Sequence, residues 1–78
     1  MVVEKIIMYL LRKKHKLKEN ERFIFLNQKN KKDQYYFNKT RIMKVWDIGF
    51  VTPSNVSINF LLSNKCKIRK VKNNEKNR

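Results

Sequence analysis

Residues 23–32 read FIFLNQKNKK and join an apolar run directly to a basic turn. Phe23 to Leu26 are apolar residues of the kind that suits a pleated strand. The turn after them carries Lys29, Lys31 and Lys32. We therefore expect a small hydrophobic platform that ends in a cationic tip, and thin apolar segments with basic ends recur along the chain.

The segment after this turn continues the predicted hairpin. Asn27 to Gln34 is rich in side chains that hydrogen-bond their own backbone, so it is predicted to be the hairpin loop. Tyr35 to Phe37 then resumes extended structure. Aromatic rings beside a basic turn could form a base-stacking surface. We favour the alternative that they pack across the hairpin on Phe23 and Phe25.

Arg41 to Val51, read as RIMKVWDIGFV, is predicted to be the central strand. Alternation places Trp46 and Phe50 on one face, and Trp46 is expected to anchor the core because it is the largest apolar side chain available. Gly49 indicates a bulge or a close approach of backbone. The sequence TPSN at Thr52 to Asn55 predicts a turn.

The best alternation in the chain runs from Val56 to Leu62 and predicts the last strand. The same parity resumes with Cys66 and Ile68 facing inward. The residues that would then face outward are Lys65, Lys67 and Arg69.

The N-terminal segment allows two interpretations. Apolar residues in Val2 to Leu11 recur at helical spacing, and Glu4 suits the first turn of an amphipathic helix. The short continuous apolar run at 6–11 also fits a strand, so both remain open. Arg12 to Lys18, RKKHKLK, follows as a basic run predicted to contact phosphates, with His15 as one more polar contact.

Together these patterns predict a mainly β fold, a small antiparallel sheet of three or four strands connected as a meander. The sheet carries basic N- and C-terminal extensions. One small RNA-binding domain is expected to occupy residues 1–78, with an extended tail from about residue 70. In a chain of 78 residues the core alone rarely supplies more than roughly 3–5 kcal/mol of stability.

The charge balance indicates the kind of partner. Twenty Lys and Arg against six Asp and Glu give a formal net charge of +14, and this like charge opposes the compact state. An anionic partner relieves that repulsion, and a phosphate backbone adds affinity through counterion release. We therefore expect nucleic acid rather than membrane as the partner, and the longest apolar run is too short to span a bilayer.

The residues that carry most enzyme and metal chemistry are scarce. Cys66 is the single cysteine, so it has no internal disulfide partner, and with His15 it makes no four-ligand zinc set. The expected role of Cys66 is a small buried apolar side chain. The carboxylates show no paired or metal-ligand spacing. We expect no enzyme activity, no cofactor and no small-molecule substrate.

Residue usage points to the source of the sequence. Alanine is absent, and Lys, Asn, Ile, Phe and Tyr, whose codons are AT-rich, fill 40 of the 78 positions. This predicts a strongly AT-biased genome, as in many organelles, parasites and large viruses, and part of the lysine excess then reflects mutational drift. Drift does not explain the near absence of carboxylates.

Three stretches resemble the large-subunit ribosomal protein thirty-three family of bacteria and mitochondria. Ile24 to Lys32 is similar to its aromatic strand and basic turn, Met43 to Asp47 to its lysine-containing step into an aromatic-Asp pair, and Lys67 to Arg69 to its closing Lys-Ile-Lys. Its opening strand would correspond to Lys5 to Arg12. Departures include a longer connection before Phe23 without the family's glycine, a longer central loop, and no proline after the Asp.

The resemblance implies a structural constituent of the large ribosomal subunit, near the tRNA exit site, in a divergent form without the family's zinc-binding cysteine pairs. The implied partners are ribosomal RNA and neighbouring ribosomal proteins, and the expected location is a ribosome, with the mitochondrion favoured. The residues predicted to contact RNA are Arg12, Lys13, Lys14, Lys16, Lys29, Asn30, Lys31, Lys32, Arg41, Lys65, Lys67, Arg69 and Lys70.

Two rival functions use the same charges. A free-standing nucleic-acid-binding regulator would fold and stay soluble without its partner. A membrane-surface protein would lay Val2 to Leu11 in the interface as a helix and place Arg12 to Lys18 on lipid headgroups.

Overall fold

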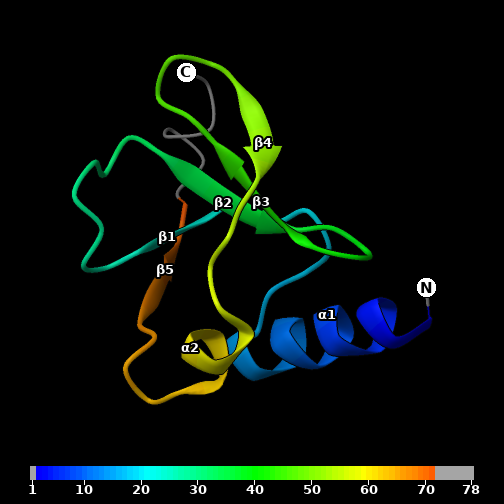
Figure 1. Cartoon of the computed structure of the whole chain (residues 1–78). Coiled ribbons are helices and arrows are strands. Elements are labelled where there is room, and N and C mark those ends of the chain that lie inside the picture. The colour runs from blue at the N-terminus through cyan, green and yellow to red at the C-terminus, as the bar shows by residue number, and fades with distance from the viewer. Residues whose placement is uncertain (1, 72–78) are drawn as a thin grey trace.

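The computed structural model describes residues 2–71, which form a five-stranded antiparallel sheet and two helices. The strands lie in the order β4-β3-β2-β1-β5 (Figure 1). In chain order the elements are α1 (Val2–His15), β1 (Phe23–Phe25), β2 (Gln34–Phe37), β3 (Ile42–Val45), β4 (Val51–Pro53), α2 (Ile58–Leu62) and β5 (Ile68–Lys70).

The N-terminal segment is a helix, which decides between the two interpretations left open by the sequence. Met8 and Leu11 of α1 are buried and Ile7 packs against the same core. Glu4 lies in the first turn and four basic residues lie in the last turn, which complements the helix dipole at both ends. Val3, Ile6 and Leu10 lie on the exposed side of the helix. Lys5 to Arg12, the counterpart of the family's opening strand, is therefore helical.

The helix ends in a Schellman motif at Lys16. The backbone N–H of Lys16 donates to Lys13 O at 3.2 Å, and that of Leu17 donates to Arg12 O at 2.8 Å. Lys16 has a φ of 58°, the left-handed conformation that this position requires and that glycine usually supplies. Leu17 then turns back into the core.

The first four strands form the predicted antiparallel meander, and β5 adds a fifth strand at the opposite edge from β4. In β2 and β3, Tyr35 lies opposite Lys44 and Phe37 opposite Ile42. β5 returns to pair with β1, where Phe25 lies opposite Ile68. The sheet has one strand more than the upper number predicted, because a turn divides the strand predicted at 41–51 into β3 and β4.

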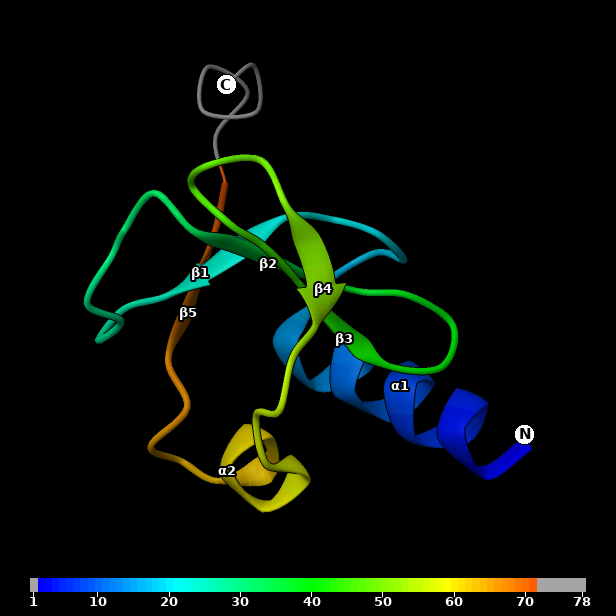
Figure 2. The same ribbon diagram turned by 45° about the horizontal axis from the view of Figure 1, so that its top comes forward.

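Both helices lie on the same side of the sheet, and the core fills the space between them and the strands (Figures 1 and 2). Phe23 and Phe37 stack with ring centroids 5.2 Å apart, and Phe25 meets Tyr35 edge-on at 4.8 Å. The prediction that the aromatic residues pack across the hairpin is confirmed for Tyr35 and Phe37. The largest fully buried side chains are Phe23, Phe37, Leu11 and Leu61.

The predicted central strand at 41–51 is wrong as a single element, because a turn at 46–50 divides it into β3 and β4. The N–H of Trp46 donates to Phe50 O at 2.8 Å, and Gly49 has a φ of 108° in the turn between them. Trp46 is 38% exposed and Phe50 63% exposed, so Trp46 does not anchor the core. The strand at the centre of the sheet is β2.

The structure also corrects the predictions for residues 52–55 and 56–62. Thr52 and Pro53 belong to β4 rather than to a turn, and the edge position tolerates a proline. The strand predicted at Val56 to Leu62 is wrong: Ile58–Leu62 is helical, because the Ser57 side chain accepts a hydrogen bond from Phe60 N at 3.3 Å and starts α2.

The prediction for the end of the described chain largely holds. Cys66 is buried and Ile68 packs against the core, as expected, while Lys65 and Lys67 are exposed. The fold class is mixed α and β rather than mainly β, because of the two helices. The expected extended tail falls outside the described residues except for its start, and Lys70 belongs to β5.

Leu10 and Leu11 are neighbours on α1 with opposite environments, 54% and 0% exposed. We expect Leu11→Ala to lower the free energy of unfolding by about 2–5 kcal/mol, because it leaves a cavity under the sheet. Leu10→Ala should change it by about 0.5 kcal/mol or less. Urea denaturation followed by far-UV circular dichroism measures both, and equal losses would contradict the packing described here.

Candidate nucleic-acid interface

Five basic side chains from three parts of the chain line one open hollow of about 530 Å³ at the C-terminal end of α1. We call it the α1 basin. Its basic residues are Arg12, Lys13, Lys16, Lys18 and Lys70. Because the helix, the segment after it and β5 each contribute, the basin exists only in the folded chain.

The fold positions each of these side chains. The Schellman turn at Lys16 carries the chain around the end of α1, so that Lys16 and Lys18 lie next to the last helical turn. Lys70 lies opposite Phe23 in the β1–β5 pair, and side chains of such a pair share a face of the sheet. Lys70 therefore lies on the side of the sheet that carries α1. Arg12 donates to Asn38 O at 3.2 Å, which ties α1 to the β2–β3 turn.

The basin keeps an excess of positive charge. Glu19 also lines it, and Glu21 pairs with Lys70 at 3.7 Å while accepting a hydrogen bond from Lys18 N at 2.9 Å. The helix dipole explains basic residues in the last turn of α1 by itself. It does not explain why Lys18 and Lys70 converge on the same hollow from outside the helix.

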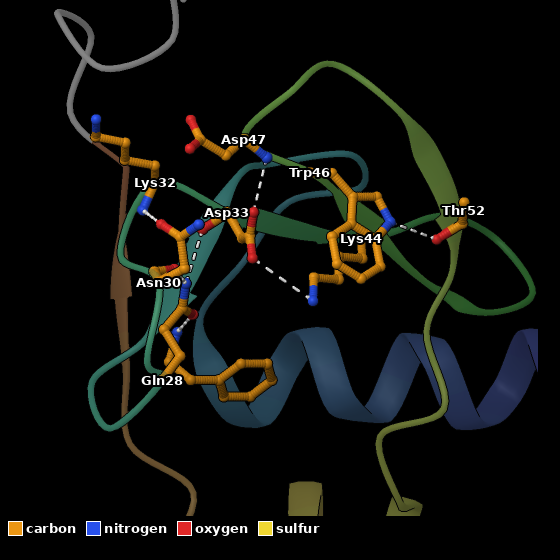
Figure 3. A network of polar contacts seen from close by, with 9 residues as sticks. Gln28, Asn30, Lys32, Asp33, Lys44, Trp46, Asp47 and Thr52 are labelled. Atoms are coloured by element: carbon orange, nitrogen blue, oxygen red, sulfur yellow. Dashed lines mark hydrogen bonds and ion pairs between the residues drawn. The ribbon is translucent and has the colours of Figure 1, made fainter.

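The β1–β2 loop forms a second basic group with a defined conformation (Figure 3). Gln28 organises this loop: its Oε1 accepts from Phe25 N at 2.7 Å, and its Nε2 donates to Asn30 O and to Asp33 O. Asn30 Oδ1 accepts from Lys32 N at 2.9 Å. The side-chain oxygen of Asn30, a predicted RNA contact, thus has a role inside the loop.

Asp33 ties this loop to the β3–β4 hairpin. Figure 3 shows its carboxylate between two partners: Oδ1 accepts from Asp47 N at 2.7 Å, and Oδ2 lies 3.6 Å from Lys44 Nζ. Lys44 in turn lies over the Trp46 ring at 3.5 Å, and Trp46 Nε1 donates to Thr52 Oγ1 at 2.8 Å. A buried carboxylate therefore fixes the position of the lysine-rich loop relative to the sheet.

The structure brings together some of the predicted contact residues and separates others. Arg12, Lys13, Lys16 and Lys70 meet in the α1 basin. The loop lysines form the second group, in which Lys31 Nζ donates to Leu26 O and Lys32 lines a smaller hollow of about 250 Å³ with Arg22. The remaining predicted residues lie outside both hollows: Lys14, Arg41, Lys65, Lys67 and Arg69.

Sequence reasoning missed three residues that these sites contain. Lys18 belongs to the basic run but was not singled out as a contact. Tyr9 lines the α1 basin and lies four residues before Lys13, the spacing of neighbours on one helix face. Arg22 lies over the Tyr36 ring at 5.6 Å on the face of the sheet away from the helices. The helical spacing of Tyr9 and Lys13 was the available signal.

His15 and Cys66 lie close together but have structural roles. His15 Nε2 donates to Leu61 O at 2.9 Å and joins the two helices. Cys66 Sγ lies 4.0 Å from the same nitrogen. Burial raises the pKa of the Cys66 thiol, and the charge of Lys14 lowers it less, so the thiol is protonated at neutral pH and is a poor nucleophile.

Within residues 2–71 no group of three or more His, Cys, Asp or Glu side chains is placed to hold a metal ion. Neither helix in that range has the length and apolar character to cross a bilayer. Comparisons with protein-family models, with curated proteins and with solved structures give no match. The function is therefore inferred from the residues and from their arrangement.

Replacing Asp33 tests the loop anchor. Asp33→Ala removes the acceptor for Asp47 N and the partner of Lys44, so we expect the free energy of unfolding to fall by about 1–3 kcal/mol. Asp33→Asn keeps a carbonyl oxygen for Asp47 N and should lose less. Thermal denaturation of both variants measures the difference. An unchanged unfolding midpoint in Asp33→Ala would show that the Asp33 contacts do not stabilise the fold.

Proposed function

We propose that this protein binds RNA through phosphate contacts and is a structural constituent of the large ribosomal subunit. The observation that carries the proposal is the α1 basin, where five cations from separate segments surround one open hollow. Like charges that line one hollow repel one another, and an anion bound among them offsets that repulsion. A chain of phosphates supplies such anions at regular intervals.

The partner implied is RNA with neighbouring ribosomal proteins, in an organellar ribosome, with the mitochondrion favoured. The resemblance of Ile24 to Lys32 to the ribosomal family supports this setting, because β1 leads into a lysine-rich loop as that family requires. Phosphate contacts position a protein without reading sequence, so specificity would come from the shape of the RNA. The proposal includes no catalytic step and no cofactor.

A free-standing nucleic-acid-binding regulator is the second candidate. The observation that favours it is the self-contained core, in which α1 and α2 cover one face of the sheet. A domain with such a core can fold without a ribosome around it. The same basin would then serve a soluble RNA or DNA partner.

Sedimentation separates these two candidates. In a lysate resolved on high-salt gradients, a ribosomal constituent is expected to migrate with the large subunit and to leave that fraction after ribonuclease treatment. Migration as a small free species would favour the regulator. Migration with membranes would contradict both and would point to the exposed apolar side of α1, Val3, Ile6 and Leu10.

Charge removal in the α1 basin tests the site itself. The double variant Lys13→Gln with Lys16→Gly removes two basin charges. Glycine at position 16 adopts the left-handed conformation without the steric strain of about 1 kcal/mol that lysine has there, so the fold should not lose stability. Binding to a synthetic RNA hairpin should weaken, and the slope of log affinity against log salt should become shallower by about 1.5–2.

The matched control is Lys5→Gln with Lys39→Gln, which removes the same charge at two exposed positions outside the basin. It should change the salt slope much less. If the control and the basin variant weaken binding equally, affinity follows net charge and the basin is not the contact site.

A further inference from the structure

One aromatic ring lies within the basic surroundings of the α1 basin. Tyr9 lines the hollow and is 50% exposed, although most rings of this chain are needed in the core. Lys13 Nζ lies over the Tyr9 ring, 5.7 Å from its centroid. Two further basic residues, Lys16 and Lys70, line the same hollow. The basin therefore combines a π-face with cations on one open surface.

We propose that the α1 basin holds one unpaired nucleotide, with its base stacked on Tyr9 and its flanking phosphates among Arg12, Lys16 and Lys70. This inference rests on the proposed function, since it names what part of the RNA the basin takes. Aromatic side chains beside a positively charged groove are the combination by which proteins bind single-stranded RNA, and each base has a π-face that such a ring can accept.

The size and shape of the hollow favour a nucleotide over the backbone of a duplex. Its volume of about 530 Å³ is within the range of pockets that enclose small ligands, roughly 300–1,000 Å³. A duplex keeps its base faces inside the stack, so a duplex would meet the cations but leave Tyr9 without a partner. An unpaired nucleotide from a loop or bulge can stack its base on Tyr9 while its phosphates meet the cations.

The other rings outside the core are less suited to stacking. Phe50 is 63% exposed but lines neither of the two basic hollows. Trp46 has Lys44 over it at 3.5 Å and donates its N–H to Thr52. Tyr36 lies on the opposite face of the sheet from α1 and lines neither of the two basic hollows. Tyr9, by contrast, lines the α1 basin together with four lysines.

The test uses the full chain and a single-stranded RNA oligonucleotide with one 2-aminopurine, whose fluorescence is quenched when the base stacks. Wild-type protein is expected to quench the probe and to bind it more tightly than a blunt RNA duplex of the same length. Tyr9→Leu should weaken binding to the single strand roughly tenfold and abolish the quenching. Tyr9→Phe should keep both, since it keeps the ring.

The control variant is Tyr36→Leu, which removes a ring from the other face of the sheet and should leave quenching unchanged. Circular dichroism confirms that each variant is folded. Quenching that depends on Tyr36, or that survives Tyr9→Leu, would overturn the proposal while leaving the proposed function intact. If wild-type protein binds neither RNA, the proposed function fails and this inference with it.

Discussion

The packing of α1 against the aromatic face of the sheet is the constraint on which the rest of the structure depends. Four rings, from Phe23, Phe25, Tyr35 and Phe37, lie on one side of two short strands, and without the helix this apolar face would be exposed to water. Leu11 closes that face, with no exposed surface of its own. A domain this small has little other apolar area to bury, so the helix and the sheet stabilise one another.

The same packing determines where the charge lies. Because Ile7, Met8 and Leu11 face the sheet, Lys13 is left on the outer side of the helix, and the turn at Lys16 keeps the basic run at the surface. The chain then returns in β5 beside β1 and adds Lys70 to the same region. A hydrophobic constraint thereby gathers cations that repel one another, at a free-energy cost that an RNA backbone would offset.

Two carboxylates of the described chain, Asp33 and Glu21, hold segments in place. Asp33 joins the β1–β2 loop to the β3–β4 hairpin, and Glu21 links the segment after α1 to β5. Each serves a structural contact with one lysine, and the remaining positive charge stays at the surface. Under the proposed function, RNA phosphates would supply further anions.

The sequence by itself determined the local features. The alternating apolar pattern around a polar loop predicted the β1–β2 hairpin and its ring packing, and the parity after Asn64 predicted the buried Cys66 and Ile68, because each depends on neighbours a few residues away. The residues able to contact phosphate were also predictable, since Lys and Arg are charged wherever they lie.

Only the tertiary structure decided which of these features come together. The alternation at 56–62 predicted a strand, but the Ser57 cap and the packing of Leu61 selected a short helix. Trp46 became a surface residue because the turn at Gly49 folds β4 back on β3. The α1 basin needs Lys70 beside Arg12, and that proximity follows from the pairing of β5 with β1, a contact between distant segments that no local pattern records.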